Sequence, residues 1–443
     1  MSFPRYPDYK DTGVEWLGKV PAHWEVTALK RNFHIVGGST PKSEMESFWD
    51  GDILWATPSD LSKIASFYLD ETQRKITGDG LASCGTSLVP ADSLILSTRA
   101  PIGSLAIAAV PMSTNQGCKS LVPAESVSSK YFAHLLSISS TELNVRGKGT
   151  TFLELSGDEL GAFKAPVPPL PEQSQIATFL DRETAKIDEL VAEQRRLMEL
   201  LKEKRQAVIS HAVTKGLNPD APMKPSCVEW LGEVPAHWEL NRIANVFREV
   251  GEPGTAELPI LSVSIHHGVS DKEIAEDELE RKVTRSDDRS KYKQVSPGDL
   301  VYNMMRAWQG GFGTVTVMGM VSPAYVVARP LKMVKTAYIE HLLRTPQAIE
   351  QMRRHSRGVT DFRLRLYWDE FKNIRVALPP IEEATAICAK ISELEERFSA
   401  MSAESAESIR LLQERRTALI SAAVTGQIDV RALSPTKAME ATT

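Results

Sequence analysis

The sequence predicts an α+β protein. Two similar α/β domains are separated by two long antiparallel coiled-coil helices, in a pseudo-two-fold, circular arrangement. A twelve-residue motif returns almost unchanged in the second half of the chain, and two long segments without glycine carry apolar residues at heptad spacing. Hydrophobic residues make up 42% and charged residues 25%, the balance of a globular protein. A chain of 443 residues exceeds one ordinary core, which favours several domains.

The repeat is the strongest signal. The motif Val14–Glu25 returns as Val228–Glu239 with eleven of twelve positions identical. Two further pairs follow the same order: Val167–Glu172 with Leu378–Glu383, and Ala207–Thr214 with Ala418–Thr425. The period is far longer than that of a solenoid, so it indicates duplication of a whole domain. The stretches between these motifs diverge, which fits two modules of one fold with different ligands and equally fits neutral drift.

The repeat divides the chain into five parts. We expect an α/β domain at 1–166, a long helix at 167–218, a second α/β domain at 219–377, a second long helix at 378–427 and a flexible tail at 428–443.

The two long helices are predicted from what their segments lack. Residues 171–214 contain no glycine, and Pro171 is their only proline. Proline is tolerated in the first turn of a helix, and Gly216 is a suitable stop. The second copy runs from Ile381 to Val424, before Gly426. At about 1.5 Å per residue, each helix would be roughly 65 Å long.

Both helices carry a heptad of pairing positions. These are Leu180, Ile187, Gln194, Leu201 and Val208 in the first helix, and Ile391, Phe398, Ser405, Leu412 and Leu419 in the second. A second stripe is expected at offset three, through Leu190, Leu197, Leu394 and Met401. This pattern favours antiparallel pairing over each helix packing on its own domain. Gln194 and Ser405 would then lie close together and fix the register.

Several classes of protein are disfavoured. The four cysteines are scattered, without a CxxC pair, which argues against zinc or a disulfide framework and fits a reducing cytoplasm. We expect no signal peptide, no membrane span and no metal site. A phosphate-binding loop and an Asn/Asp-Pro-Pro-aromatic methyltransferase site are both missing from the sequence. Asp361 with Glu370 and Lys372 mimics a nuclease pattern, but the first half has no matching lysine. No catalytic residue is predicted.

The charge distribution limits any DNA-binding surface to local patches. The net charge is −5, whereas nucleic-acid binders usually carry a basic excess. The segment 344–375 is an exception, with 8 basic and 4 acidic residues. Two modules related by a pseudo-two-fold axis would match the symmetry of duplex DNA, with the helices setting the spacing of two half-sites.

The motifs resemble a known family. Trp-Leu-Gly-x-Val-Pro-x-His-Trp before each module, Pro-Pro-Leu-Pro-Glu-Gln at 168–173 and Ala-Val-Thr-Lys-Gly at 212–216 are similar to motifs of the specificity subunits of type I restriction–modification systems. Gly37–Pro41 followed by Gly51–Trp55 resembles the start of a target-recognition domain. The likeness extends over nearly the whole chain, twice over. One departure is Ala384, where the family often has glutamine after two glutamates.

The resemblance implies a function for each part. Each α/β domain would be a target-recognition domain that reads one half of a bipartite, asymmetric site in double-stranded DNA. The helices would dock two adenine methyltransferase (modification) subunits, and two restriction subunits would complete the nuclease. S-adenosylmethionine, ATP and magnesium would belong to those partners, with no cofactor in this chain. The alternative is a coiled-coil scaffold that never reads DNA, which the acidic net charge supports.

Candidate DNA-contacting residues are Arg, Lys, Asn and Gln side chains, which can read base edges, and basic or small polar side chains, which can contact phosphate. Arg146, Lys148, Thr150 and Thr151 are favoured because they lie in a glycine-broken turn, where the backbone can approach a phosphate closely. In the first domain they are Arg99, Asn115, Gln116, Lys119, Arg146, Lys148, Thr150 and Thr151. In the second domain they are Arg306, Gln309, Arg353, Arg354, His355, Arg357, Thr360, Arg363 and Arg365. Arg306 is matched to Arg99 because each lies seven residues after an aspartate. The four repeated tryptophans, Trp16, Trp24, Trp230 and Trp238, are interpreted as packing or docking residues.

Overall fold

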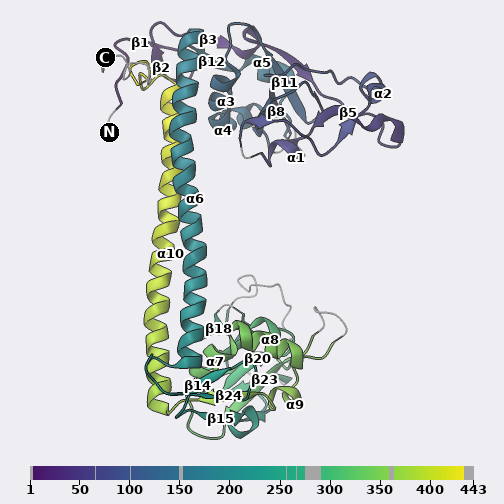
Figure 1. Ribbon diagram of the computed structural model, residues 1–443. Coiled ribbons are helices and arrows are strands. Elements are labelled where there is room, and N and C mark those ends of the chain that lie inside the picture. Colours follow the sequence, from purple (N-terminus) through teal and green to yellow (C-terminus); the bar gives the residue numbers. More distant parts are fainter. Residues whose placement is uncertain are drawn as a thin grey trace. The chain divides into compact units, whose positions relative to one another are not determined.

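The computed structural model confirms the predicted fold class of helices, sheets and two long helices (Figure 1). It describes residues 3–64, 66–99, 101–148, 153–255, 257–265, 267–274, 291–358 and 364–433. The long helices are α6, Leu170–Lys215, and α10, Ile381–Val424. The chain forms two compact units. Unit 1 comprises Met1–Gln194 and Glu407–Thr443, and unit 2 comprises Arg195–Ala406. Each unit therefore contains about half of each long helix.

Unit 1 is built around a five-stranded sheet of order β4-β11-β8-β9-β6. Its strands are β4 (Phe33–Gly37), β11 (Cys118–Pro123), β8 (Leu94–Ser97), β9 (Leu105–Ala108) and β6 (Tyr68–Leu69). A smaller sheet contains β10 (Ser113–Thr114), β5 (Trp49–Ala56) and β7 (Lys75–Ile76). Two strand pairs complete the unit: β1 (Tyr9–Asp11) with β2 (Lys19–Pro21), and β3 (Glu25–Ala28) with β12 (Lys164–Val167). The short helices are α1 (Pro58–Leu61), α2 (Gly78–Ala82), α3 (Ser129–Ile138), α4 (Ser140–Arg146) and α5 (Gly157–Ala162).

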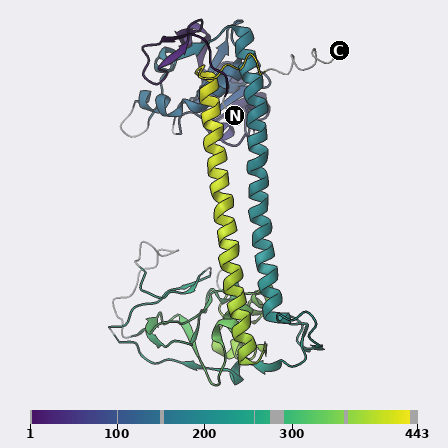
Figure 2. The ribbon, with the colours of Figure 1, turned by 90° about the vertical axis from the view of Figure 1, so that its left-hand side faces the viewer.

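Unit 2 (the teal and green domain in Figure 2) repeats this plan. Its main sheet has four strands in the order β16-β23-β20-β21. Its strands are β16 (Phe247–Val250), β23 (Tyr325–Pro330), β20 (Leu300–Asn303) and β21 (Phe312–Thr314). The strand pairs are β13 (Met223–Pro225) with β14 (Glu233–Pro235), β15 (Glu239–Arg242) with β24 (Arg375–Leu378), β17 (Val263–Ser264) with β18 (Gly268–Val269), and β19 (Lys293–Val295) with β22 (Gly319–Val321). The short helices are α7 (Thr336–Leu343), α8 (Pro346–His355) and α9 (Trp368–Phe371).

The main core of each unit includes residues from both long helices. In unit 1, Trp24 and Tyr131 lie in one cluster with Leu180 of α6 and Val424 of α10. Trp238 and Tyr338 hold the matching places in unit 2, again with residues of both helices. Trp24 is 0% exposed and Trp238 1% exposed, while Trp16 and Trp230 pack partly buried against the same cores. The repeated tryptophans are packing residues, as predicted.

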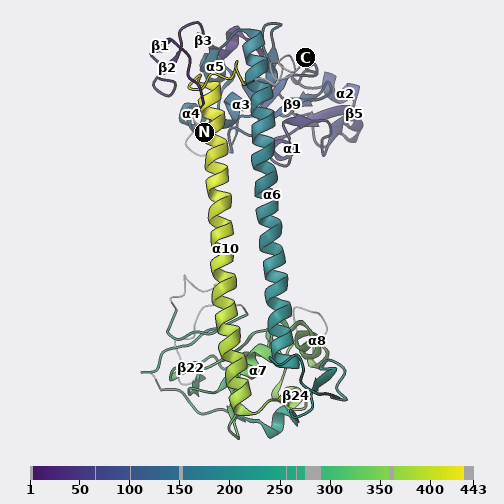
Figure 3. The same cartoon turned by 60° about the vertical axis from the view of Figure 1, so that its left-hand side comes forward.

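The long helices run antiparallel within each unit (Figure 3). In unit 1, Arg416 of α10 makes an ion pair of 2.9 Å with Asp188 of α6. In unit 2, Arg205 of α6 makes an ion pair of 2.7 Å with Glu395 of α10. Because these contacts join α6 to α10, the helices do not fold back separately onto their own domains.

Most of the heptad positions are shielded from solvent. Leu180, Ile187, Leu201, Ile391 and Ser405 are buried, and Gln194, Val208, Phe398, Leu412 and Leu419 are half-buried. The expected second stripe at offset three is exposed at three of its four positions. Leu190, Leu197 and Met401 are 46%, 40% and 38% exposed and Leu394 is half-buried, whereas Thr184 and Val191, at offset four in α6, are buried. The apolar positions of a coiled coil alternate at spacings of three and four residues. The side on which the partner helix lies decides whether it covers the residues three or four positions after each heptad position.

Across the described ranges, no helix combines the length and the apolar character that a membrane span requires.

Candidate DNA interface

A buried carboxylate joins the repeated motif of unit 1 to the first turn of α6. Glu172 is 6% exposed and accepts hydrogen bonds from Tyr6 Oη and, at 3.1 Å, from Trp24 Nε1. Its other oxygen lies 2.8 Å from His23 Nε2. Burial and the adjacent carboxylate hold the pKa of Tyr6 well above its usual value, so the phenol remains a donor. The Pro-Ala-His-Trp motif therefore fixes the first domain to its helix.

Unit 2 repeats this contact with fewer donors. Trp238 Nε1 donates to Glu383 Oε1 at 3.2 Å, and His237 Nε2 lies 2.7 Å from Glu383 Oε2. Glu383 occupies the same position in α10 as Glu172 does in α6. The sequence analysis did not assign either glutamate a partner, although their identical positions in the repeat were a signal.

Two equivalent tyrosines contact the last turn of the other long helix. The Tyr131 hydroxyl lies 3.0 Å from the carbonyl oxygens of both Pro166 and Val424. The Tyr338 hydroxyl lies 2.9 Å from the carbonyl oxygen of Ala377 and 2.8 Å from that of Val213. Each α/β domain is thus bonded to the beginning of one long helix and to the end of the other.

Four of the predicted DNA-contacting residues meet at one end of the main sheet of unit 1. We call the residues 37–40, 98–99 and 115–119 the strand-end surface of unit 1, because β4 and β8 end there and β11 begins there. Thr98 N donates to Gly117 O at 2.8 Å, and Lys119 lies opposite Gly37 in the register. The Thr40 hydroxyl donates to Gln116 Oε1. Arg99, Asn115, Gln116 and Lys119 therefore share one surface.

An antiparallel bridge between Lys148 and Glu154 adds Lys148 to this surface and brings carboxylates with it. Lys148 and Glu154 exchange two backbone hydrogen bonds of 3.0 Å. The Glu154 side chain lies 3.2 Å from Arg99, and Glu159 of α5 lies 2.7 Å from Lys148 and 3.9 Å from Arg146. The Lys148 ammonium holds the pKa of Glu159 below its usual value. The three predicted cations already have anionic partners, with which a DNA phosphate must compete.

The equivalent surface of unit 2 is more basic. We call residues 303–309, 357 and 365 the strand-end surface of unit 2. Residues 303–309 lie at and after the end of β20. Arg357 and Arg365 exchange two backbone hydrogen bonds of 2.9 Å, and Leu366 N, next to Arg365, donates to Met304 O. Arg357 is ion-paired with Glu370 of α9, as Lys148 is with Glu159. Arg306 and Arg365 have no ion pair within the described parts of unit 2.

The bridges Lys148–Glu154 and Arg357–Arg365 can be aligned through one equivalent hydrogen bond in each unit. Leu155 N donates to Thr98 O at 2.8 Å in unit 1, and Leu366 N donates to Met304 O at 2.9 Å in unit 2. Arg365 consequently occupies the position of Glu154. Met305 occupies that of Arg99, so the match of Arg99 with Arg306 is wrong by one residue. Counting from the aspartates placed it incorrectly because Asp92 and Asp299 are not equivalent. Asp92 matches Gly298, the other residue with positive φ in these turns, and Ser93 matches Asp299.

Three further candidates of unit 2, Arg353, Arg354 and His355, lie in the last turn of α8. Arg353 lies 3.7 Å from Glu350, and Arg354 lies 3.3 Å from Glu350 and 3.6 Å from Glu229. His355 Nδ1 lies 2.9 Å from the carbonyl oxygen of Gln351. Gln309 is exposed on the strand-end surface. Thr150, Thr151, Thr360 and Arg363 lie outside the described residues.

In the part of the chain that the structure describes, neither surface has the geometry of a metal centre. Among the described residues, no group of three or more histidine, cysteine or acidic side chains is placed to hold a metal ion. Glu370 and Lys372, which mimic a nuclease pattern in sequence, are ion-paired with Arg357 and Asp369 respectively. The surfaces offer guanidinium, ammonium, amide and hydroxyl groups, which suit phosphate and base contacts.

Comparison with known proteins adds a family to this geometry. Residues 21–198 match the type I restriction modification DNA specificity domain. The chain is 32% identical over 248 residues to the type I restriction enzyme MjaIX specificity subunit of Methanocaldococcus jannaschii, covering 54% of this chain and 55% of the relative. It is 28% identical to the EcoR124I/EcoR124II specificity subunit of Escherichia coli, over 39% of this chain and 42% of that protein. The matches thus span about half the length of these curated relatives.

Solved structures show the same fold at low sequence identity. One solved structure describes the complex assembly and conformational transition of a type I restriction–modification system. A chain of that structure superposes with a TM-score of 0.64 at 15% identity. It covers 91% of this chain and 98% of the other. The HsdS subunit from Thermoanaerobacter tengcongensis gives a TM-score of 0.53 at 16% identity, covering 92% and 98%.

The fold and the matched family model together indicate a DNA specificity domain at residues 21–198. Over about half of its length, the chain is similar to specificity subunits of type I restriction–modification systems.

Proposed function

We propose that this chain is the DNA-reading subunit of a type I restriction–modification complex and is non-catalytic by itself. Each unit reads one half of a bipartite, asymmetric site, and the paired helices set the spacing between the halves. The match of residues 21–198 to a DNA specificity domain carries this proposal. The unlike strand-end surfaces support it, because Arg365 replaces Glu154 and two units that differ in charge at the same position suit different half-sites.

The long helices offer surfaces for partner subunits. Leu190 and Leu411 are 46% and 50% exposed in unit 1, and Leu200 and Met401 are 52% and 38% exposed in unit 2. Apolar side chains exposed on a regular surface suit protein–protein contact. We assign them to two adenine methyltransferase subunits, with two restriction subunits completing the nuclease. S-adenosylmethionine, ATP and magnesium are assigned to those partners, and the whole complex to the cytoplasm.

Methylome sequencing of host cells with and without this chain tests the proposal. The expected result is adenine methylation at one bipartite motif that disappears when the chain is deleted, together with co-purification of a methyltransferase. An unchanged methylome, with co-purification of other proteins only, would favour the coiled-coil scaffold.

A substitution pair tests the strand-end surface of unit 2. Replacing Arg306 and Arg365 with alanine removes two cations that have no acidic partner in the described part of unit 2. If both contact phosphates, the slope of log K against log salt falls by about 1.8, so affinity changes about tenfold less between roughly 50 and 200 mM salt. The control is Arg354→Ala, whose guanidinium already faces Glu350 and Glu229. Equal slopes for wild type and the double variant would exclude these phosphate contacts.

A further inference from the structure

A buried amide side chain occupies a defined place in unit 1. Gln173 is 0% exposed in the first turn of α6. Its Oε1 accepts a hydrogen bond of 2.8 Å from Ser128 N, at the start of α3. Its Nε2 lies 2.9 Å from Pro168 O and 3.4 Å from Ser126 O. One carboxamide thus pairs with a backbone donor and two backbone acceptors from two segments.

Unit 2 has the same backbone around this place but lacks the side chain. Tyr131 and Tyr338 are equivalent, and so are β12 and β24, because each tyrosine hydroxyl contacts the matching strand. This alignment pairs Ser126 with Met333, Ser128 with Lys335, Pro168 with Pro379 and Gln173 with Ala384. Ala384 is 3% exposed and carries no polar group.

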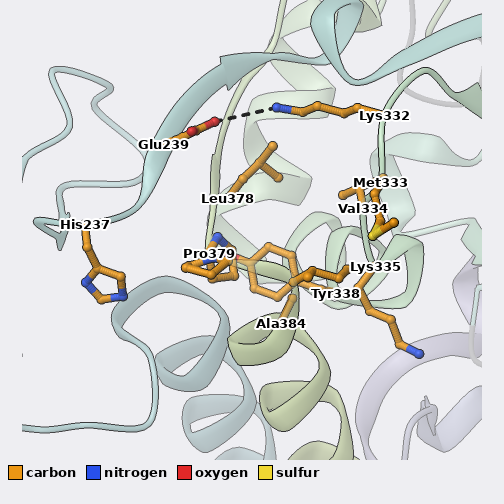
Figure 4. A pocket seen from close by; sticks show the side chains of 12 residues that line it. His237, Glu239, Lys332, Met333, Val334, Lys335, Tyr338, Leu378, Pro379 and Ala384 are labelled. Atoms are coloured by element: carbon orange, nitrogen blue, oxygen red, sulfur yellow. Dashed lines mark ion pairs between the residues drawn. The ribbon is translucent and has the colours of Figure 1, made fainter.

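A cavity of about 330 Å³ lies at this position in unit 2 (Figure 4). Met333, Lys335, Tyr338, Pro379 and Ala384 are among its lining residues. The hydrogen bonds of the described residues include none from Lys335 N and none to Met333 O or Pro379 O. Lys335 and Pro379 are half-buried, and Met333 is 85% exposed. These lining residues therefore retain the donor and the acceptors that Gln173 satisfies in unit 1.

The geometry points to a binding site for a primary carboxamide in unit 2, supplied by a free small molecule or by a glutamine side chain of another polypeptide. A carboxamide carries an acceptor for Lys335 N and donors for Met333 O and Pro379 O on neighbouring atoms. A carboxylate of the same shape lacks the donors and would face two carbonyl oxygens. A ketone likewise leaves both carbonyls unpaired. Exposed Met333 and the half-exposed Lys332 lie at the cavity, which leaves a path for entry.

Nuclear magnetic resonance of the full chain labelled with ¹⁵N-lysine tests this site. The Lys335 amide signal is assigned by its loss in Lys335→Arg, which keeps the backbone N–H. Propionamide is the probe, and we expect a saturable shift of this signal with a dissociation constant on the order of millimolar. Propionate is the matched control and should give no saturable shift. Ala384→Gln should move the signal without ligand and abolish the response to propionamide.

The reciprocal change provides a gain of binding that does not depend on unit 2. Gln173→Ala in a chain labelled with ¹⁵N-serine should make the Ser128 amide respond to propionamide, whereas the wild-type Ser128 amide does not. N-acetylglutamine methylamide distinguishes the sources of the carboxamide. If N-acetylglutamine methylamide binds more tightly than propionamide, the carboxamide is supplied by a glutamine of a polypeptide. If it binds equally or more weakly, the ligand is a free carboxamide. A Lys335 signal that does not saturate, or that responds equally in Ala384→Gln, overturns the proposal.

Discussion

Removing the Glu172 carboxylate should loosen the attachment of the first domain to α6. Glu172→Ala leaves Tyr6 Oη and Trp24 Nε1 buried without an acceptor, at 3% and 0% exposure. Each buried donor without a partner costs about 1–3 kcal/mol, so we expect a loss of about 2–6 kcal/mol in the stability of unit 1. The matched change Glu383→Ala leaves fewer buried donors unpaired. His237 is 48% exposed, and among the described residues of unit 2 Glu383 has no partner that corresponds to Tyr6. Its cost should be about 1–3 kcal/mol.

Native-state hydrogen exchange measures this loss at the site. The indole N–H of Trp24 and the amides of β2 and β3 should exchange at least about 30-fold faster in Glu172→Ala, because 1.4 kcal/mol corresponds to about tenfold. The signals of unit 2 serve as an internal reference. Glu172→Gln keeps one acceptor oxygen and should lose less protection than the alanine variant. The reasoning fails if Trp24 keeps its wild-type protection in Glu172→Ala, or if Glu383→Ala proves the more damaging change.

Three further results are expected. Gly426 has φ +73°, and an added Cβ would lie 2.3 Å from Pro21 Cδ. At Gly216 the nearest atom to an added Cβ, Glu383 Oε1, would lie 3.1 Å away. Gly426→Ala should therefore lower the melting temperature more than Gly216→Ala, and the reverse order would contradict this packing. A hydrogen bond with His134 holds the pKa of Asp181 below its usual value, so its contribution is present above the unfolded-state pKa and lost as pH falls through the folded-state pKa. Urea unfolding should therefore separate wild type from Asp181→Asn near neutral pH and bring them together in acid, and a pH-independent gap would refute the linkage. Inserting one heptad into both long helices should lengthen the spacer between methylated half-sites and leave the half-sites unchanged, and methylome sequencing that finds altered half-sites with an unaltered spacer would exclude the helices as the ruler.

The acidic partners of the predicted DNA-contacting residues were beyond what the sequence shows. Arg99 and Glu154 are 55 positions apart, and only the bridge between their backbones places their side chains 3.2 Å apart. A local count of basic residues therefore favoured Arg353 and Arg354, both of which face Glu350 on the same helix. Arg306 and Arg365 stand out once their surroundings are known. Ion pairing depends on distances between separate segments, which composition does not contain.

The sequence by itself determined the duplication, the two long helices and the packing role of the repeated tryptophans. These features follow from periodicity and local backbone preference, which neighbouring residues carry. The tertiary structure decided which residues beside the heptad positions are buried, which arginines and lysines have an acidic partner, and that a cavity lies where Gln173 would be in unit 2. Each of these depends on which atoms of distant segments come within a few ångströms of one another, and a single sequence does not encode that proximity in any local pattern.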